Sequence, residues 1–280
     1  MAIPNQLCAK ALATAVLLAL PVASSAAPLR FTSAASAQST CDYPAIHFGP
    51  ALAPFALLSG TTITNTGNSI VSRSAARNSD DLIGVWPGTA VTGFYPPGLD
   101  SGGPKAIYAA AYNTNRTVPA AAQARLATVY KDVAAQKPTM LVSGDLSQVH
   151  VPGYPVGSLP PGVYSSASTL GIMAGNLTLV QSHSGLPPVF IFQVATSFTT
   201  TASGPVGGNV ILGKGIDACN VVWQVGDDAT LGGASFAGSM LAYSAITIEG
   251  TSIVGRGLSL NGAVTMTASG GTHVTNPGGR

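Results

Sequence analysis

Short apolar runs alternate with Gly, Asn and Ser along most of this 280-residue chain, and one pattern recurs within them. In this pattern, a threonine follows an apolar residue and usually precedes another. The spacing becomes regular late in the chain, where segment 244–248 returns as 262–266, a shift of 18 residues. The central threonines of the pattern are Thr64, Thr178, Thr199, Thr230, Thr247 and Thr265.

Repeats of this length, built from short strands, are typical of a β-solenoid, in which each coil lays one strand on each of its faces. Three strands per coil predict a mostly β fold of triangular cross-section. The six triplets predict about six coils, stacked at about 4.8 Å per coil. The one long step between triplets contains the turn-rich stretch 203–218, which we interpret as a looped-out insertion.

The triplets also predict an outward column of threonines, because successive side chains on a strand point to opposite sides. The apolar residues of each triplet would face the core and the threonine would face away. Asp228 and Glu249 fall at outward positions too, so they either mark the edge of this face or indicate that another face is the functional one. The alternation adds four outward neighbours: Thr201, Ala245, Ala263 and Thr267.

One long helix is predicted over residues 118–137, after a loop-rich cap at 93–117. Thr117 is a good N-cap, Pro119 suits the first turn, and Lys137-Pro138 ends the helix. Its length of about 28 Å, at about 1.5 Å per residue, matches the predicted stack of coils. Four residues at helical spacing give it an apolar face: Leu126, Val129, Tyr130 and Val133.

Two runs, 189–192 and 221–223, are apolar at every position, as expected of strands that are buried on both sides. We expect them between the solenoid core and the helix. The threonine column would then lie on a face that the helix leaves open.

The N-terminus is typical of a secretory signal, predicted at 1–37. Lys10 precedes an apolar run at 11–23, and Ser24-Ser25-Ala26 and Ala35-Ser36-Ala37 are candidate cleavage sites. An uncleaved anchor is the alternative, although the run is short for a membrane span. A lead-in at 38–50, one domain at 51–275 and a tail at 276–280 would follow, and we expect the mature protein to be secreted.

The low charge of the chain excludes some classes of binding partner. Only 8% of the residues are charged, against roughly 25% in ordinary globular domains, and the net charge is +2. We therefore expect no nucleic-acid partner, and no membrane association after signal cleavage. The four histidines lack the spacing of metal ligands, so we expect no metal and no cofactor. We also expect the protein to be a monomer.

Two cysteines remain after removal of the signal, Cys41 and Cys219. An even number of cysteines in an oxidising compartment permits a disulfide, which would tie the N-terminal segment to the body. Two buried free thiols are the alternative.

Several stretches resemble the secreted ice-binding proteins of the DUF3494 type, across about residues 50–275. The matching stretches are Phe55–Gly67, Gly84–Phe94, Leu159–Tyr164, and Ala218–Gly226 followed by Ala229–Gly232. The resemblance implies a discontinuous right-handed β-solenoid with a long helix alongside, and a flat, uncovered face that binds ice without enzymatic chemistry.

On this interpretation, ice contacts the threonine column: Thr64, Thr178, Thr199, Thr230, Thr247 and Thr265, with Thr201 and Thr267 beside it. Exposed threonines are also simply good strand residues. The main alternative is an extracellular β-helix enzyme acting on polysaccharide, which would need clustered carboxylates, and the chain has ten Asp and Glu in all. A cell-surface adhesin module is a third interpretation, which predicts a tether or added domains.

Overall fold

The computed structural model describes residues 46–278, with gaps at 68, 73–80, 95–105, 111, 184, 186, 202–206 and 269–270. All of these residues belong to one compact unit, Ala37–Arg280. The predicted signal peptide and most of the lead-in lie outside the described residues.

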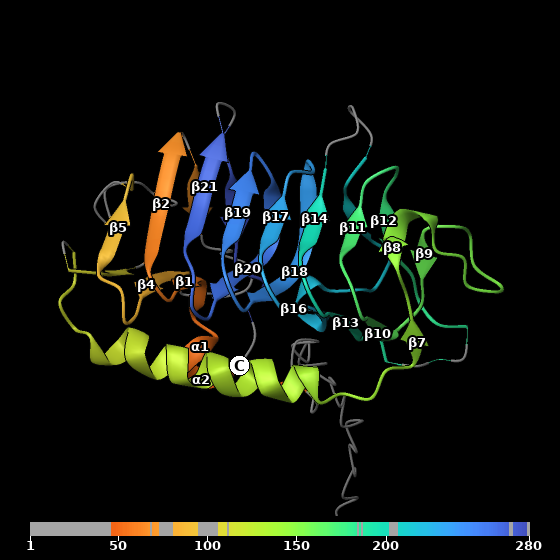
Figure 1. The fold of residues 1–280 in the computed structure, drawn as a ribbon, viewed down its shortest axis with the longest axis horizontal. Coiled ribbons are helices and arrows are strands. Elements are labelled where there is room, and N and C mark those ends of the chain that lie inside the picture. Colours follow the sequence, from red (N-terminus) through yellow and green to blue (C-terminus); the bar gives the residue numbers. More distant parts are fainter. Residues whose placement is uncertain are drawn as a thin grey trace, which may run out of the picture. The chain divides into compact units, whose positions relative to one another are not determined.

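Three parallel sheets form in the described residues of the unit, as expected for a β-solenoid (Figure 1). Strands of one coil lie on different sheets, and each sheet pairs strands of coils that are neighbours in space. The eight-stranded sheet consists, in spatial order, of β5 (Ala90–Thr92), β2 (Thr62–Gly67), β21 (Val264–Ala268), β19 (Ile246–Glu249), β17 (Ala229–Leu231), β14 (Phe198–Thr200), β11 (Leu170–Ile172) and β8 (Gly144–Asp145).

The eleven-stranded sheet lies beside the helix (Figure 1). Its path runs β6 (Ile107–Tyr108), β4 (Leu82–Val85), β1 (Phe55–Ser59), β20 (Ser252–Ser259), β18 (Ser235–Ala242), β16 (Val221–Val225), β13 (Phe190–Val194), β10 (Gly162–Ser166) and β7 (Met140–Leu141), with β22 (His273–Thr275) paired to β20 and β3 (Ile70–Ser72) paired to β22. The three-stranded sheet is β15 (Val210–Leu212), β12 (Leu177–Leu179) and β9 (Ser158–Leu159).

The spatial order departs from simple coil-by-coil stacking. β1 and β2 come early in the chain, yet they lie between β4 and β20 and between β5 and β21. In the described residues, the eight-stranded sheet has more strands than the six predicted coils. Five of its strands carry a predicted triplet and β5, β8 and β11 carry none, while the Thr178 triplet lies on another sheet. The stretch 203–218 is not only loop, since β15 forms within it, and β6 forms within the predicted cap.

The long helix α2 spans Thr117–Ala134, and its buried side chains include Leu126, Val129 and Val133, as predicted. The prediction for its start is wrong by one residue: Arg116 holds the N-cap position, and the Asn115 Oδ1 atom accepts hydrogen bonds from the Thr117 N–H and hydroxyl. The helix also ends before residue 137. The Gln193 side-chain amide donates to the Val133 carbonyl oxygen near this end, at 2.9 Å.

Two apolar layers hold the unit together. One lies inside the solenoid, and the other lies between the eleven-stranded sheet and the helices α1 (Gly49–Leu52) and α2. Ile191 of β13 and Val222 of β16 pack in the helix-side layer, while Phe192 and Trp223 pack in the inner one. The prediction that segments 189–192 and 221–223 separate the core from the helix is therefore confirmed.

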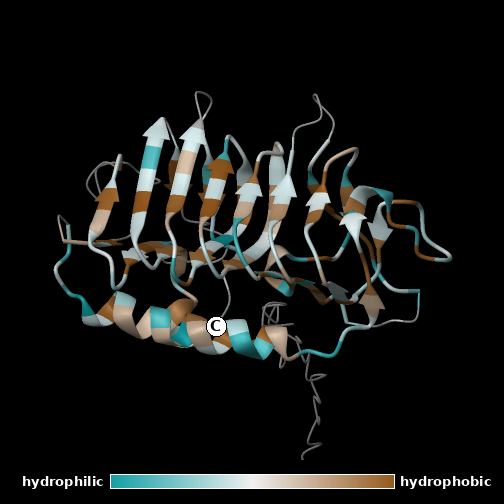
Figure 2. Cartoon of the chain, in the orientation of Figure 1, coloured by the Kyte–Doolittle hydropathy of each residue, from teal (hydrophilic) through white to brown (hydrophobic). Residues whose placement is uncertain are grey.

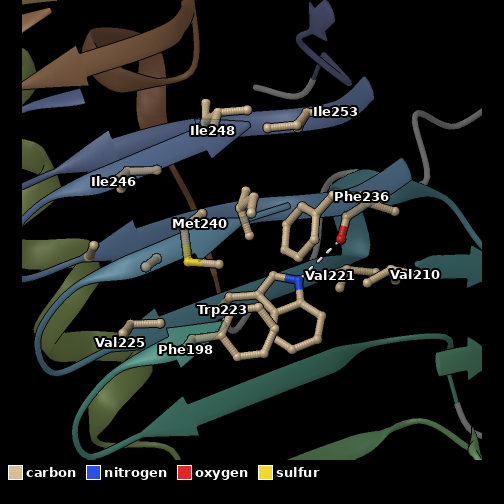
Figure 3. Close-up of a cluster of buried hydrophobic side chains, with 14 of the residues drawn as sticks. Phe198, Val210, Val221, Trp223, Val225, Phe236, Met240, Ile246, Ile248 and Ile253 are labelled. Carbon is tan, nitrogen blue, oxygen red and sulfur yellow. Dashed lines mark hydrogen bonds between the residues drawn. The ribbon is translucent and has the colours of Figure 1, made fainter. Parts of the chain in front are cut away.

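Trp223 lies in the middle of the inner layer (Figure 3). Its ring stacks on Phe192 with centroids 3.9 Å apart, and its indole N–H donates to the Ala237 carbonyl oxygen at 3.1 Å. Phe198 and Phe236 pack against it at centroid distances of 4.8 and 5.3 Å. These large rigid rings fill the interior, so the three sheets are supported from within.

Candidate functional site

Helix α2 packs on the eleven-stranded sheet, and the outer side of the eight-stranded sheet faces away from it (Figure 1). We call this outer side the threonine face. Its strands alternate between hydrophobic and more polar residues along their length (Figure 2). Triplets such as Ile246-Thr247-Ile248 are buried, partly exposed and buried in turn. The apolar residues therefore anchor the strand, and the threonine stays at the surface.

Strand pairing brings threonines into one row across the face. Thr64 is the Cα partner of Thr265, and the row continues from Thr265 to Thr247, Thr230 and Thr199 on successive strands. On its other side, Thr64 is paired with Thr92 of β5. In the structure, the threonine column consists of these six residues, with Thr92 inside it and Thr178 outside it. Five steps of about 4.8 Å give it a length of about 24 Å.

The structure brings together most of the predicted residues. Thr201 and Thr267 follow Thr199 and Thr265 by two positions, which places them on the same side of the sheet. Thr178 is the exception, and its predicted place in the column is wrong. It lies in β12 of the three-stranded sheet, between Ser158 and Ile211. Its triplet has the same burial pattern, but a solenoid has such triplets on more than one face.

Three outward threonines were missed by the sequence reasoning. Thr62 and Thr66 lie two positions before and after Thr64 on β2, and Thr92 ends β5. The alternation rule that identified Thr267 would have found Thr62 and Thr66. Thr92 carried a weaker signal, because the residue that follows it is a glycine and not an apolar residue.

The column ends at β14. On the next strand, Gly171 takes the threonine's place, and a Cβ there would lie 3.2 Å from the Met173 side chain. Met173 therefore folds back over this position, and it is 41% exposed. Asp145 of β8 follows as the next partner. A bulky thioether and a carboxylate thus replace the flat row of threonines at this end.

Carboxylates also lie beside the column. Glu249 and Asp228 are exposed, as predicted, on and next to β19 and β17. The Asp228 Oδ1 atom accepts a hydrogen bond from the Ala245 N–H at 2.7 Å. Burial would raise the pKa of the Asp145 carboxyl, but hydrogen bonds from Ala174, Ser147 and Met173 outweigh this effect and hold the pKa below its ordinary value.

Apart from the threonine face, the described residues bear on three other kinds of site: a metal centre, a membrane span and a ligand-binding cleft. No group of three or more His, Cys, Asp or Glu within them is arranged to hold a metal ion, and none of their helices is both long and apolar enough to cross a membrane. A cleft of about 270 Å³ lies between β15 and β18, away from the column. Its described lining is mainly apolar, and Asp217 is the one carboxylate among those residues. A glycosidase of the usual kind uses a pair of carboxyl groups, and the described lining of this cleft supplies one.

Of the two cysteines in the predicted disulfide, only Cys219 lies in the described residues. Cys219 is disulfide-bonded and buried, in the short helix η4 (Ala218–Asn220) before β16. Cys41 lies outside the described residues, so the pairing of Cys41 with Cys219 stays a prediction.

Comparison with known proteins gives one consistent result. A protein-family profile described as "Ice-binding-like" matches residues 57–271. An ice-binding protein from Nostoc sp. (strain HG1) is 37% identical over 216 residues, covering 76% of this chain and 68% of that protein.

Solved structures agree in fold. An ice-binding protein from an Arctic yeast, described for its antifreeze activity, is 28% identical with a TM-score of 0.62, over 81% of this chain and 94% of that one. The DUF3494 domain of Shewanella frigidimarina ice-binding protein 1 is 23% identical with a TM-score of 0.65, over 82% of this chain and 97% of that one, and it supports the fold alone.

Proposed function

We propose that this protein adsorbs to ice through the threonine face, on the premise that the chain belongs to the ice-binding-like family. The observation that carries the proposal is the threonine column. Six threonines stand in register on six consecutive strands, on a sheet that the long helix does not cover.

The chemistry of threonine suits a surface of ordered water. Its branched side chain populates few rotamers, so little entropy is lost when the face binds. The methyl group is apolar, and the hydroxyl can donate and accept hydrogen bonds. Buried neighbours such as Ile63, Ile248 and Leu231 hold the strands rigidly from below. The face therefore presents a fixed array of intermediate polarity.

Many weak contacts on one rigid face sum to strong adsorption. Ice that grows between adsorbed molecules must bulge, and that curvature lowers the local freezing point. This mechanism needs no covalent chemistry, no cofactor and no metal. Because the N-terminus is typical of a secretory signal, the proposal includes secretion with removal of residues 1–37, and a monomer is sufficient for the mechanism.

The test is a thermal-hysteresis and ice-recrystallisation assay on the mature protein, with a matched pair of variants. Thr265→Tyr places a bulky ring in the middle of the column. Thr178→Tyr makes the same change at the centre of a triplet with the same burial pattern, but on the three-stranded sheet.

We expect wild type and Thr178→Tyr to be active, and Thr265→Tyr to lose most of its activity while keeping its melting temperature. Absence of activity in the wild type would reject the function. An active wild type with equal losses in both variants would reject the face.

A further inference from the structure

Charge is distributed unevenly along the threonine face. Glu249 is the strand partner of Thr267, and Asp228 lies two residues before Thr230. Both carboxylates are exposed. The outward positions of β5, β2 and β21, by contrast, are threonine or alanine. The column therefore passes from an uncharged region at Thr92, Thr64 and Thr265 to a charged one at Thr230.

The side chain of Glu249 leans toward the charged end. Its Oε2 atom lies 3.5 Å from the place where a Cβ would stand on Gly232, the residue after β17. Asp228 lies at the opposite end of the same two strands, where its Oδ1 atom accepts the hydrogen bond from the Ala245 N–H. Both carboxylates thus occupy the surface over β19 and β17.

The two regions also differ in width. On β2 and β21, threonines form a two-dimensional array, with Thr64 opposite Thr265 and Thr66 opposite Thr267, and Thr62 extends it. Outward neighbours on one strand are about 6.6 Å apart, and strands are about 4.8 Å apart. On β17, Thr230 stands alone between Asp228 and Gly232. Thr199 and Thr201 form a smaller group at β14, so the threonine array that spans two paired strands lies on β2 and β21.

We propose that ice contact is confined to the uncharged region formed by β5, β2 and β21, and that the Thr230–Thr199 end of the column does not touch ice. This inference rests on the proposed function. A carboxylate binds its own water strongly, and removing that water is costly without a compensating partner. Ice offers no cation, so the surface around Asp228 and Glu249 keeps its liquid hydration shell.

The decisive comparison is Thr64→Tyr against Thr199→Tyr. Both residues are partly exposed members of the column on strands of the same sheet, one inside the uncharged region and one beyond the carboxylates. We expect Thr64→Tyr to lose most of the thermal hysteresis and Thr199→Tyr to keep nearly all of it. Equal losses, or a larger loss in Thr199→Tyr, would overturn the inference.

A second pair covers the case in which a tyrosine disturbs folding. Thr267→Glu and Thr201→Glu each place a carboxylate two residues after a column threonine. We expect the first to lose hysteresis and the second to retain it, with both folded by circular dichroism. A reversed or equal result would again overturn the inference.

Removing the carboxylates tests the cause. In the double variant Asp228→Asn with Glu249→Gln, we expect hysteresis to rise and the added change Thr199→Tyr to become harmful. If Thr199→Tyr stays harmless there, the carboxylates do not set the boundary and the inference is wrong. A wild type without hysteresis would reject the proposed function itself, which separates the two failures.

Discussion

The Ser59 hydroxyl donates a hydrogen bond to the Gly262 carbonyl oxygen at 2.8 Å, although 203 residues separate them in the chain. The Thr61 N–H donates to the same oxygen at 3.3 Å. These bonds join the turn between β1 and β2 to the turn before β21. The pairing of Thr64 with Thr265 therefore forms only when an early segment and the last coil meet.

Gly60 makes this junction possible, and substituting it should weaken the junction. A Cβ at Gly60 would lie 2.5 Å from the Leu260 carbonyl oxygen and 2.8 Å from the Asn261 Cα. Both are backbone atoms that cannot turn away, so we expect Gly60→Ala to lower the free energy of unfolding by about 1–3 kcal/mol. Urea denaturation measures the loss.

Gly175→Ala is the matched control for Gly60→Ala. The nearest atom to a Cβ at Gly175 is the Ser147 Cβ at 3.4 Å, an ordinary contact. We expect a change within about 0.5 kcal/mol. Similar losses in the two variants would show that the junction is not tightly packed.

The sequence predicts the local pattern well, for physical reasons that are local. Alternation within triplets identifies which side of each strand is buried, and the spacing of Leu126, Val129 and Val133 identifies the buried face of the helix. Apolar residues at successive positions around Ile191 and Val222 identify strands with two buried sides. These features depend on a few neighbouring residues.

The sequence does not identify which sheet a triplet joins. Thr178 and Thr230 stand in triplets with the same burial pattern, yet they lie on different sheets. The insertion of β2 between β5 and β21 is equally hidden, because it depends on contacts between distant segments. Loop lengths and turn geometry decide such placements, and no triplet encodes them.

Arg256 of β20 contacts residues near both ends of the described chain, and we expect its substitution to destabilise the fold. Its guanidinium donates to the carbonyl oxygens of Ala53 and Gly278 at 3.1 and 3.0 Å, and it lies 4.7 Å from the centre of the Phe48 ring. Burial lowers the pKa of Arg256 to about 10, while the negative charge of Asp81 acts in the opposite direction. Arg256 is therefore charged at neutral pH.

Arg256→Met should lower the free energy of unfolding by about 3–5 kcal/mol, because it leaves the buried Asp81 without this nearby cation. Asp81 has φ of +44°, a conformation that asparagine tolerates, so Asp81→Asn is a usable partner variant. We expect the double variant to lose clearly less than the sum of the single losses. Additive losses in chemical denaturation would show that the two residues are not coupled.

Asp145 should make the stability of the β8 end depend on pH. Its Oδ1 atom accepts from the Ser147 N–H at 3.0 Å, and its Oδ2 atom accepts from the Ala174 N–H at 2.8 Å. Because the folded-state pKa is lowered, the stabilisation is present above the ordinary value of 3.8 and is lost as the pH falls through the folded-state pKa.

We expect Asp145→Asn to cost about 1 kcal/mol at pH 7, because an amide nitrogen in place of Oδ2 cannot accept from the Ala174 N–H, and we expect this cost to be smaller at pH 2. Urea denaturation at both pH values gives the comparison. Asp132→Asn, on the exposed side of α2, is the control and should stay within about 0.5 kcal/mol throughout. A difference at Asp145 that is equally large at both pH values would point to a packing effect and not to its charge.

The partner of Cys219 tests the disulfide and the signal peptide together. If residues 1–37 are removed, Cys8 goes with them, and Cys41 is the cysteine left to pair with the buried Cys219. We expect peptide mapping without reduction to find the Cys41–Cys219 pair in the secreted protein. Cys41→Ser should lower the free energy of unfolding by about 2–5 kcal/mol, because the bond closes a long loop, and Cys8→Ser should change nothing. Recovery of a Cys8–Cys219 peptide would contradict both predictions at once.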